Sequence, residues 1–476
     1  MKKTLQLQSI LILLILLGCK KDTKKQEQQE NSPQKEVVES KKPDKPLKIS
    51  EKQAEALYDY AYPLVMMKIS QDAMLSSPLR KDDHLNQFIM FKQLAQPENT
   101  AVVLGNRNTL YCVGWVDLSQ GPVLFEIPDM NKRYYVMPLI DAWTNTFKSL
   151  GSRTTGQKAQ KYILTLPNYK GELPKDYTQI ECPTAMVWIT GRIQADNDKD
   201  ALKANALQAQ YVLKSYNSDN TLNQYKPQFK AMEVKKPVPF SLTMGAEEFY
   251  NTFFAMLKNN PPAKADLKFL KPFGMDKNPF PNSFEQLSKS NQESLRAGLK
   301  TREAYYKKIF YKGSEQKSAW DFKIEDMGDW GTNYERRAYF AVWGIGANIP
   351  QDAVYGVSQL DGNLKQLDGS NTYRISFPID GTPEVGGFWS ITAYNNEGYL
   401  EHNDQNRYAT GSNMPIQFNS DYSLDLYLSA IKPKGVPKYN WIPTPDGTFK
   451  ILFRMYWPKE SILDGSYTLP NIEKID

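Results

Sequence analysis

The chain has 476 residues and a formal net charge of +6, which is concentrated at its N-terminus: residues 1–19 carry +2, residues 20–48 carry +3 and residues 49–476 only +1. Because a nucleic-acid-binding protein carries its basic surface on the folded domain itself, this near-neutral body argues against nucleic acid as a partner. The length of the body corresponds to two or three domains, each with enough apolar residues for a core.

Residues 1–19 have the three parts of an export signal. Lys2 and Lys3 form a positive start, and an apolar run follows from Ile10 to Leu17. The run is about half of the roughly 20 apolar residues that cross a bilayer. The segment therefore predicts a signal peptide and not a membrane span.

The end of this run, Leu16-Leu17-Gly18-Cys19, matches a lipobox. In such a motif the cysteine thiol receives diacylglycerol, and the mature N-terminus then carries fatty acids such as palmitate. We therefore expect an exported lipoprotein, anchored through Cys19 in the cell envelope, at the outer membrane and facing the periplasm or the cell surface. A plain secretory signal with an incidental cysteine is the alternative.

Residues 20–48 are mostly Lys, Glu, Gln, Asp, Ser and Pro, and they include no aromatic residue. Such a segment buries too little apolar surface to offset the entropy that ordering would cost. We predict a disordered, charged tether that separates the membrane anchor from the folded body.

The body alternates between helical and β-favouring patterns. Residues 49–74 place apolar side chains at helical spacing and predict an amphipathic helix that contains Pro63. Residues 101–195 then break into short β-favouring runs at 101–104, 110–116, 123–127, 133–139, 161–166 and 185–189. Helical patterns follow at 200–216, 246–258, 284–310 and 334–347, and a second β-rich stretch runs from 354 to 456.

These patterns predict an α+β, mainly β protein with two tandem antiparallel β-sandwich or jelly-roll-like domains and helical insertions. The expected parts are a lipoprotein signal peptide with lipobox at 1–19, a tether at 20–48, an N-terminal helix plus first β domain at 49–216, a helix-rich connecting region at 217–347 and a second β domain at 348–476.

The two β-rich stretches repeat one another. Tyr111 is followed six residues later by Asp117, and Tyr355 is followed six residues later by Asp361. The apolar run that ends at Pro128 has a counterpart that ends at Pro378. We therefore predict a duplicated β domain in which these residues superpose. Chance similarity among common strand and turn residues is the alternative.

The spacing continues beyond these strands. Asp141 precedes Arg153 by twelve residues, and Asn395 precedes Arg407 by the same number, with Thr410-Gly411 close behind. If Arg153 pairs with Asp141, the neutral Asn395 leaves Arg407 without an internal counter-charge. We therefore expect Arg407 to face solvent or a cavity and to bind an acidic ligand, whereas Arg153 is mainly structural.

Several strings resemble a known pair of bacterial domains. The strings Tyr60-Ala-Tyr-Pro-Leu-Val-Met66, Gly105-Asn-Arg-Asn-Thr-Leu-Tyr111 and Gly151-Ser-Arg-Thr-Thr-Gly156 are similar to the domain of unknown function numbered 1254. The second half resembles its usual companion, numbered 1214, through Gly387-Phe-Trp-Ser-Ile-Thr-Ala-Tyr394, Asn440-Trp-Ile-Pro-Thr-Pro445 and Arg454-Met-Tyr-Trp-Pro458. The resemblance implies two linked β-sandwiches with helical insertions and no assigned reaction. Asn108 stands where the family's usual pattern has Asp, which puts an acid-base role at this position in doubt.

Few residues suit known catalytic or metal chemistry. The chain contains no phosphate-binding loop, no Gly-x-Ser-x-Gly string and no zinc-protease helix, and we expect no metal site. We interpret its two histidines, His84 and His402, as surface residues, because each lies in a polar turn. Cys112 and Cys182 either pair in an oxidising compartment or remain two buried thiols, and we favour the thiols.

A polar and aromatic set at matching places in both repeats remains as the candidate ligand site. It comprises Asn106, Asn108, Tyr111, Arg133, Asp141 and Arg153 in the first repeat, with Asp361, Trp389, Tyr394, Asn403 and Arg407 in the second. Each residue also has a structural interpretation as a turn, ion-pair or core residue.

We favour an envelope protein that binds a small or acidic ligand in a pocket between the two β domains. A hydrolase or other enzyme acting on an envelope or extracellular small molecule is the main alternative, and a structural interaction protein with flat aromatic patches is the third. Clustering of Arg133, Asp141, Arg153 and Arg407 around one cavity would favour the first two. The sequence identifies neither a catalytic residue nor a cofactor, an oligomeric state or a partner other than the membrane and such a ligand.

Overall fold

The computed structural model describes residues 48–76, 85–99, 103–217, 225–230, 233–277, 280–312, 316–322 and 324–476. The predicted signal peptide, the tether up to residue 47 and His84 lie outside the described residues. So do residues 101–102 of the first predicted strand, and residues 103–104 are a turn. The fold below therefore concerns the body alone.

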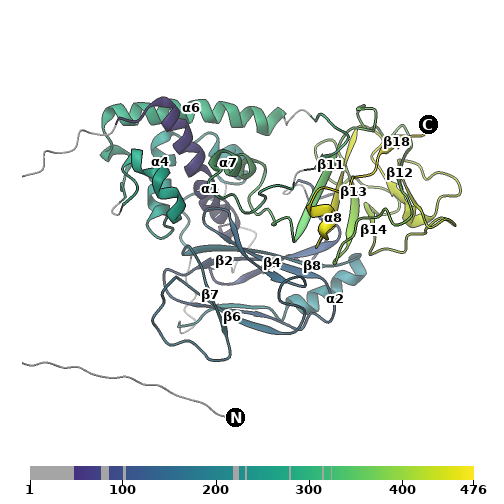
Figure 1. Ribbon diagram of the computed structural model, residues 1–476, viewed down its shortest axis with the longest axis horizontal. Coiled ribbons are helices and arrows are strands. Elements are labelled where there is room, and N and C mark those ends of the chain that lie inside the picture. Colours follow the sequence, from purple (N-terminus) through teal and green to yellow (C-terminus); the bar gives the residue numbers. More distant parts are fainter. Residues whose placement is uncertain are drawn as a thin grey trace, which may run out of the picture. The chain divides into compact units, whose positions relative to one another are not determined.

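The first β domain is a sandwich of two sheets with strand orders β1-β2-β8-β4-β5 and β7-β6-β3-β9 (Figure 1). Its inner faces enclose one apolar core, because alternate side chains of each strand point between the sheets. The strands are β1 (Phe88–Met90), β2 (Thr109–Asp117), β3 (Val123–Ile127), β4 (Tyr135–Asp141), β5 (Thr146–Gly151), β6 (Gln160–Thr165), β7 (Thr178–Glu181), β8 (Met186–Gln194) and β9 (Val212–Ser215).

The second β domain is also a sandwich, with strand orders β10-β11-β17-β13-β14 and β16-β15-β12-β18. Numbered within each domain, the two orders are the same, and the parallel pair β6 and β7 recurs as β15 and β16. The strands are β10 (Asp321–Phe322), β11 (Ala353–Ser358), β12 (Tyr373–Phe377), β13 (Trp389–Asn395), β14 (Ala409–Gly411), β15 (Leu424–Ser429), β16 (Trp441–Pro443), β17 (Phe449–Tyr456) and β18 (Ile472–Lys474). The first strand of this sandwich lies inside the predicted connecting region.

Strand register supports the predicted superposition of the tyrosines. Tyr111 lies opposite Arg192 of β8, and Tyr355 lies opposite Arg454 of β17. Asp141 and Asn395 end equivalent strands and accept a hydrogen bond from the backbone N–H four residues further on, at 2.9 Å in both cases. The two sandwiches therefore share register as well as strand order.

The predicted equivalence of Arg153 and Arg407 is wrong. Gly151 of β5 lies opposite Val136, whereas the residue in that place in the second domain is Gly411, opposite Ser390. The connection between β13 and β14 is longer than the one between β4 and β5, so equal sequence spacing ends in different places. The structural counterpart of Arg153 is Asn413, and the match of Thr155-Gly156 with Thr410-Gly411 fails for the same reason.

A helical layer surrounds the first helix. A capping box between Ser50 and Gln53 begins α1 (Glu51–Leu75), which packs against α3 (Pro237–Ser241), α4 (Ala246–Leu257), α6 (Lys289–Lys312) and α7 (Tyr334–Trp343). The short helices are α2 (Asp198–Gln208), α5 (Leu267–Leu270) and α8 (Glu460–Leu463), with 3-10 turns at Lys264–Asp266, Lys271–Phe273, Phe284–Gln286 and Lys438–Asn440. The predicted helix over 200–216 is thus α2 followed by strand β9.

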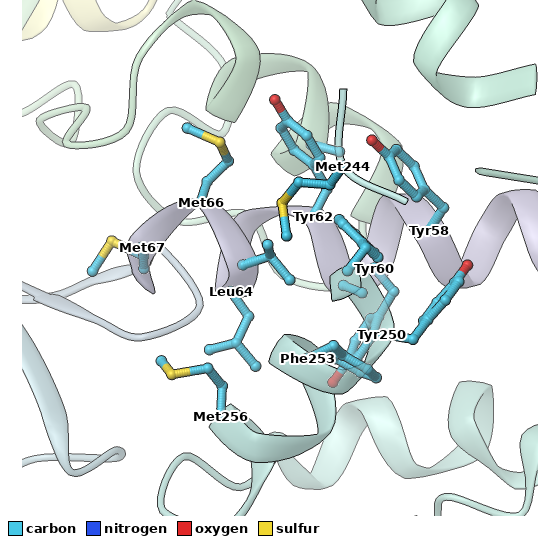
Figure 2. Close-up of a cluster of buried hydrophobic side chains, with 14 of the residues drawn as sticks. Tyr58, Tyr60, Tyr62, Leu64, Met66, Met67, Met244, Tyr250, Phe253 and Met256 are labelled. Carbon is cyan, nitrogen blue, oxygen red and sulfur yellow. The ribbon is translucent and has the colours of Figure 1, made fainter. Parts of the chain in front are cut away.

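Helix α1 is buried on all sides and is not an amphipathic surface helix. Tyr58, Tyr60 and Tyr62 are each 0% exposed. The rings of Tyr58 and Tyr62 lie side by side, 5.7 Å apart, whereas Figure 2 shows Tyr60 pointing to another side of the helix. Tyr58 stacks on Phe249 of α4 with ring centroids 4.6 Å apart. A helix enclosed in this way needs apolar or aromatic residues around its whole circumference.

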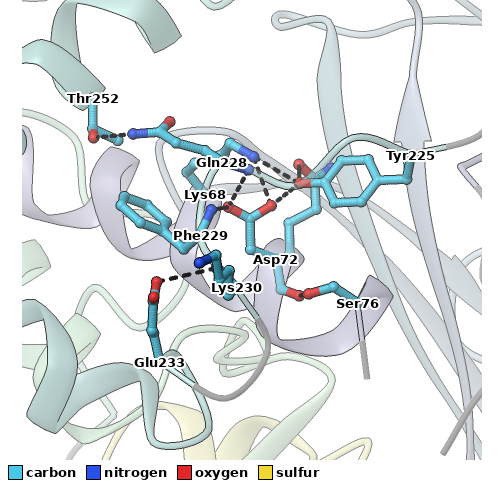
Figure 3. A network of polar contacts seen from close by, with 10 residues as sticks. Lys68, Asp72, Ser76, Tyr225, Gln228, Phe229, Lys230, Glu233 and Thr252 are labelled. Atoms are coloured by element: carbon cyan, nitrogen blue, oxygen red, sulfur yellow. Dashed lines mark hydrogen bonds and ion pairs between the residues drawn. The ribbon is translucent and has the colours of Figure 1, made fainter. Parts of the chain in front are cut away.

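The C-terminal end of α1 is fastened by a buried carboxylate (Figure 3). Asp72 is 0% exposed and accepts hydrogen bonds from Lys68 at 2.7 Å, from the Tyr225 hydroxyl and from the backbone N–H groups of Gln228 and Phe229. These donors satisfy a charge that would otherwise be costly to bury. The network therefore ties residues 225–229 to α1.

The cysteine prediction is confirmed, because Cys112 and Cys182 are both free and buried. In the part of the chain that the structure describes, no helix combines the length and apolarity needed to span a membrane. Within the same residues, no group of three His, Cys, Asp or Glu side chains is arranged to hold a metal ion.

Candidate functional site

The outer faces of the two five-stranded sheets pack against each other. Tyr134 and Val136 of the first domain form one apolar cluster with Ala353, Phe388 and Tyr456 of the second. These residues alternate along their strands with residues of the sandwich cores, so each sheet is apolar on both faces here. The interface is therefore built from strands that are apolar on both faces.

Arg454 of β17 crosses this interface. Its Nη2 donates to the carbonyl of Leu104 at 2.7 Å and to the Tyr394 hydroxyl at 2.8 Å, and its Nη1 donates to Thr392 at 3.0 Å. The residue is only 3% exposed. Its guanidinium is thus committed to protein acceptors on both sides of the interface.

Arg192 of β8 occupies the equivalent place in the first domain. Its Nη1 donates to Asn348 at 2.8 Å and to the carbonyl of Thr190 at 3.2 Å, and its guanidinium also forms a side-chain hydrogen bond with the Tyr111 hydroxyl. Its Nε and Nη2 donate to no carbonyl, carboxylate or amide oxygen of the described residues. The side chain is half-buried, and its guanidinium carbon lies 5.4 Å from the centre of the Tyr111 ring.

The two arginines make reciprocal contacts. Arg192 reaches Asn348 of the second domain, and Arg454 reaches Leu104 of the first. Leu104 and Asn348 each stand five residues before the equivalent strands β2 and β11. The sandwiches are therefore related across their interface by an approximate two-fold, as in a symmetric dimer.

The centre of this interface holds two positive charges without a carboxylate partner. No described carboxylate lies within ion-pair distance of Arg192 or Arg454. Instead, Tyr111 and Tyr456 lie within electrostatic range of both guanidinium groups. Burial raises the pKa of Tyr355, which receives a hydrogen bond from Asn348 at 2.6 Å. Burial thus keeps the Tyr355 hydroxyl neutral, and the two arginines make the site electropositive.

An ion pair fastens one side of the interface. Asp352 of the second domain is 2% exposed and accepts hydrogen bonds from Nε of Arg153 at 2.8 Å and from the Ser149 hydroxyl. Its carbonyl accepts from the Tyr134 hydroxyl at 3.3 Å. Arg153 therefore pairs with Asp352 and not with Asp141, and it has the structural role expected from the sequence.

Asn108 is the counterpart of Asp352, one residue before the equivalent strand. The carbonyl of each accepts a hydrogen bond from a matching backbone N–H, of Ala195 and Trp457 respectively. Asn108 is 0% exposed, and in the part of the chain that the structure describes neither polar atom of its side-chain amide has a hydrogen-bond partner. Asn413, the structural counterpart of Arg153, donates to Asp196 and not to Asn108. The ion pair between Arg153 and Asp352 therefore has no counterpart in the other half of the approximate two-fold.

Besides Arg153, four of the residues predicted from sequence lie at this interface. Asn106 donates to the Tyr456 hydroxyl at 2.6 Å, and Tyr394 donates to the carbonyl of Gly105 at 2.6 Å. Tyr394 also accepts from Arg454, Tyr111 lies within electrostatic range of both arginines, and the backbone N–H of Asn108 donates to Asn106. The fold therefore brings this part of the predicted set together at the domain interface.

Four other predicted residues have local structural roles. Asp141, Asp361 and Asn403 accept hydrogen bonds from backbone N–H groups two or four residues further on, and so close tight turns. Trp389 is 2% exposed in the core of the second sandwich. None of the four is placed to hold a ligand.

Arg133 belongs to a separate place. It forms a two-pronged ion pair with Asp200 at 2.6 and 2.9 Å and lines a shallow cavity of about 410 Å³ together with Lys132, Lys203 and Leu207. Asp141, Arg153 and Arg407 do not line this cavity. The four residues therefore do not cluster around one cavity, and the grouping that would have favoured a ligand-binding protein or an enzyme is not found among the described residues.

Arg407 does not face solvent, contrary to the sequence prediction. It is 8% exposed, its Nη1 donates to the carbonyl of Trp441, and its Nε and Nη2 have no hydrogen-bond partner among the described residues. Burial lowers its pKa to about 10. It does lack a carboxylate, as expected, but the rings of Trp441 and Tyr439 cover it at 5.3 and 5.8 Å.

Sequence reasoning missed Arg192, Arg454, Asn348 and Tyr456. The available signal was the register of the repeat, since Arg192 and Arg454 face the matched pair Tyr111 and Tyr355. His402, the histidine that the structure describes, lies on the surface as expected, with 74% of its side chain exposed. Its Nε2 lies 3.0 Å from Glu98.

Two sandwiches of equal topology, packed sheet to sheet beside a helical layer, define the class of protein. Residues 85–215 match the family described as "Protein of unknown function (DUF1254)", and residues 352–460 match "Protein of unknown function (DUF1214)". The chain thus belongs to the two-domain family that carries the first domain in its N-terminal half and the second in its C-terminal half.

Comparison with solved structures finds one protein that shares this fold and a second, weaker match. The VPA0106 protein from Vibrio parahaemolyticus is 22% identical, with a TM-score of 0.67, and the match covers 90% of this chain and 100% of that one. An uncharacterized protein from Burkholderia cenocepacia is 11% identical, with a TM-score of 0.38, and the match covers 92% of each chain. No curated protein matches the chain.

Proposed function

We propose that this protein binds a small acidic ligand between its two β-sandwiches. The observation that carries the proposal is the pair Arg192 and Arg454, which lies at the domain interface without a carboxylate of the described residues. A buried cation without a counter-ion is costly, and an anionic ligand removes that cost. Because ligand sites are common at domain interfaces, the location favours the same interpretation.

The surroundings support a small anion with an apolar part. Tyr111 and Tyr355 are half-buried and present both a ring and a hydroxyl. The guanidinium group binds a planar carboxylate through two parallel hydrogen bonds. A short aliphatic or aromatic carboxylic acid combines these features.

Thermal unfolding of the full-length protein tests the proposal. Acetate, benzoate and succinate are titrated at constant ionic strength, with acetamide and benzamide as uncharged controls of the same shape. We expect a saturable rise in the melting temperature with at least one acid, because a ligand that binds only the folded state stabilises it. Equal effects of acids and amides, or no effect of any acid, would contradict the proposal.

We further propose that the protein is an exported lipoprotein held in the envelope by lipid on Cys19. The lipobox string and the charged segment after it support this proposal. In bacterial cells, the Cys19→Ser variant should leave the membrane fraction and lose incorporation of radiolabelled palmitate. Retention of the variant in membranes at the wild-type level would sink the idea.

A further inference from the structure

The approximate two-fold presents two equivalent arginines, but they differ in how many donors remain free. Arg454 donates through both terminal nitrogens to four protein acceptors, counting a weak bond of 3.5 Å to Gly105. Arg192 donates to backbone and amide acceptors through Nη1 alone. The two positions therefore have the same origin in the fold and different capacity for a ligand.

Burial divides the two arginines in the same way. Arg454 is 3% exposed, and Tyr394 and Tyr456 beside it are 0% exposed. Arg192 is half-buried, and so are Tyr111 and Tyr355 near it. Arg454 is therefore enclosed by the interface, whereas the Arg192 side chain keeps part of its surface exposed.

We propose that Arg192 is the ligand-binding arginine and that Arg454, at the equivalent position, has a structural role. This inference rests on the proposed function and assigns its site to one half of the two-fold. The ligand is a small carboxylate whose two oxygens accept from Nε and Nη2 of Arg192, with the Tyr111 hydroxyl as a third donor. Arg454 adds a favourable long-range charge and keeps the two sheets together.

The matched variants Arg192→Met and Arg454→Met separate the two roles. With benzoate as the probe, Arg192→Met should bind at least tenfold more weakly than the wild type, with little change in melting temperature without ligand. Arg192→Lys should regain only part of the affinity, because lysine lacks the planar fork. Arg454→Met should mainly lower the melting temperature, because it leaves several buried acceptors without a donor.

Chemical modification gives a readout that needs no variant. Phenylglyoxal, which reacts with accessible guanidinium groups, is applied to the folded full-length protein, and the modified peptides are mapped by mass spectrometry. Arg192 should react at least tenfold faster than Arg454, and benzoate should slow its reaction.

The outcomes distinguish the two proposals. If Arg192 reacts first but no acid binds the wild type, the proposed function fails and the division between the arginines stands. If the wild type binds benzoate and Arg192→Met binds it equally well, the assignment to Arg192 is overturned. Equal reactivity of the two arginines would overturn it as well.

Discussion

Replacing Arg153 with Met is expected to lower the free energy of unfolding by about 3 kcal/mol or more, the range for breaking a buried ion pair by removing one partner. The change leaves the carboxylate of Asp352, 2% exposed, with the Ser149 hydroxyl as its remaining side-chain donor. The loss should appear in urea unfolding of the full-length protein as a lower midpoint with an unchanged slope.

Arg407→Met is the matched control, because it removes a buried arginine that has no carboxylate partner. We expect its effect to stay within about 1 kcal/mol, since the lost bond to the Trp441 carbonyl is offset by removal of an unpaired buried charge. The order of the two effects is the one that the sequence predicts, but for Arg407 the reason is burial and not exposure to solvent. A larger loss for Arg407→Met than for Arg153→Met would contradict the stabilising role of the ion pair between Arg153 and Asp352.

Asp141→Asn is expected to remove a pH dependence of stability between about pH 4 and 6. Burial raises the pKa of Asp141 from 3.8 to about 6. A carboxyl whose pKa is raised in the folded state binds its proton more tightly there, so its contribution to stability is greatest at low pH. That contribution falls as the pH rises from about 4 to 6 and is constant above. The difference between a pKa of 3.8 and one of about 6 corresponds to a contribution of roughly 3 kcal/mol to the free energy of unfolding at low pH.

Asparagine suits this position because the second sandwich already uses it. Asn395 closes the equivalent turn and accepts from the backbone N–H of Tyr399 at 2.9 Å. Urea unfolding of the wild type and the variant at pH 4, 5, 6 and 7 measures the difference, and groups common to both cancel, including Asp59 with its own raised pKa. The variant should gain stability relative to the wild type as the pH rises. A constant difference across this range would show that Asp141 does not titrate there.

The match between prediction and structure is closest where hydrophobic periodicity determines the secondary structure. Strand β3 has the predicted bounds, Val123–Ile127, and helix α4, Ala246–Leu257, differs by one residue from its prediction. Strands β1, β5, β7 and β9 of the first sandwich were not predicted. Strands β1, β7 and β9 have only three or four residues, and such short strands carry few residues of the pattern. The end of the predicted helix over 200–216 became β9 because it completes the edge of a sheet, which is a tertiary effect.

The candidate site shows the same limit. Asn106, Asn108, Tyr111 and Tyr394 were identified from their place in the repeat and do meet at the interface. Arg153 and Arg407 were paired by equal spacing along the chain, which counts loop residues as if they were strand residues. A longer connection in the second sandwich therefore ended the correspondence.

The sequence by itself determined the class of the fold, the repeat of its two sandwiches and the family, because strand periodicity, turn residues and family strings are local patterns. It also predicts the lipid anchor. Only the tertiary structure decided which charges have partners. Asp352 and Arg153 are 199 residues apart and form an ion pair, Asn108 stays without one, and Arg192 and Arg454 differ in exposure although they occupy equivalent places. Partnering and burial depend on how two sheets pack, and that packing joins segments whose separation along the chain carries no local signal.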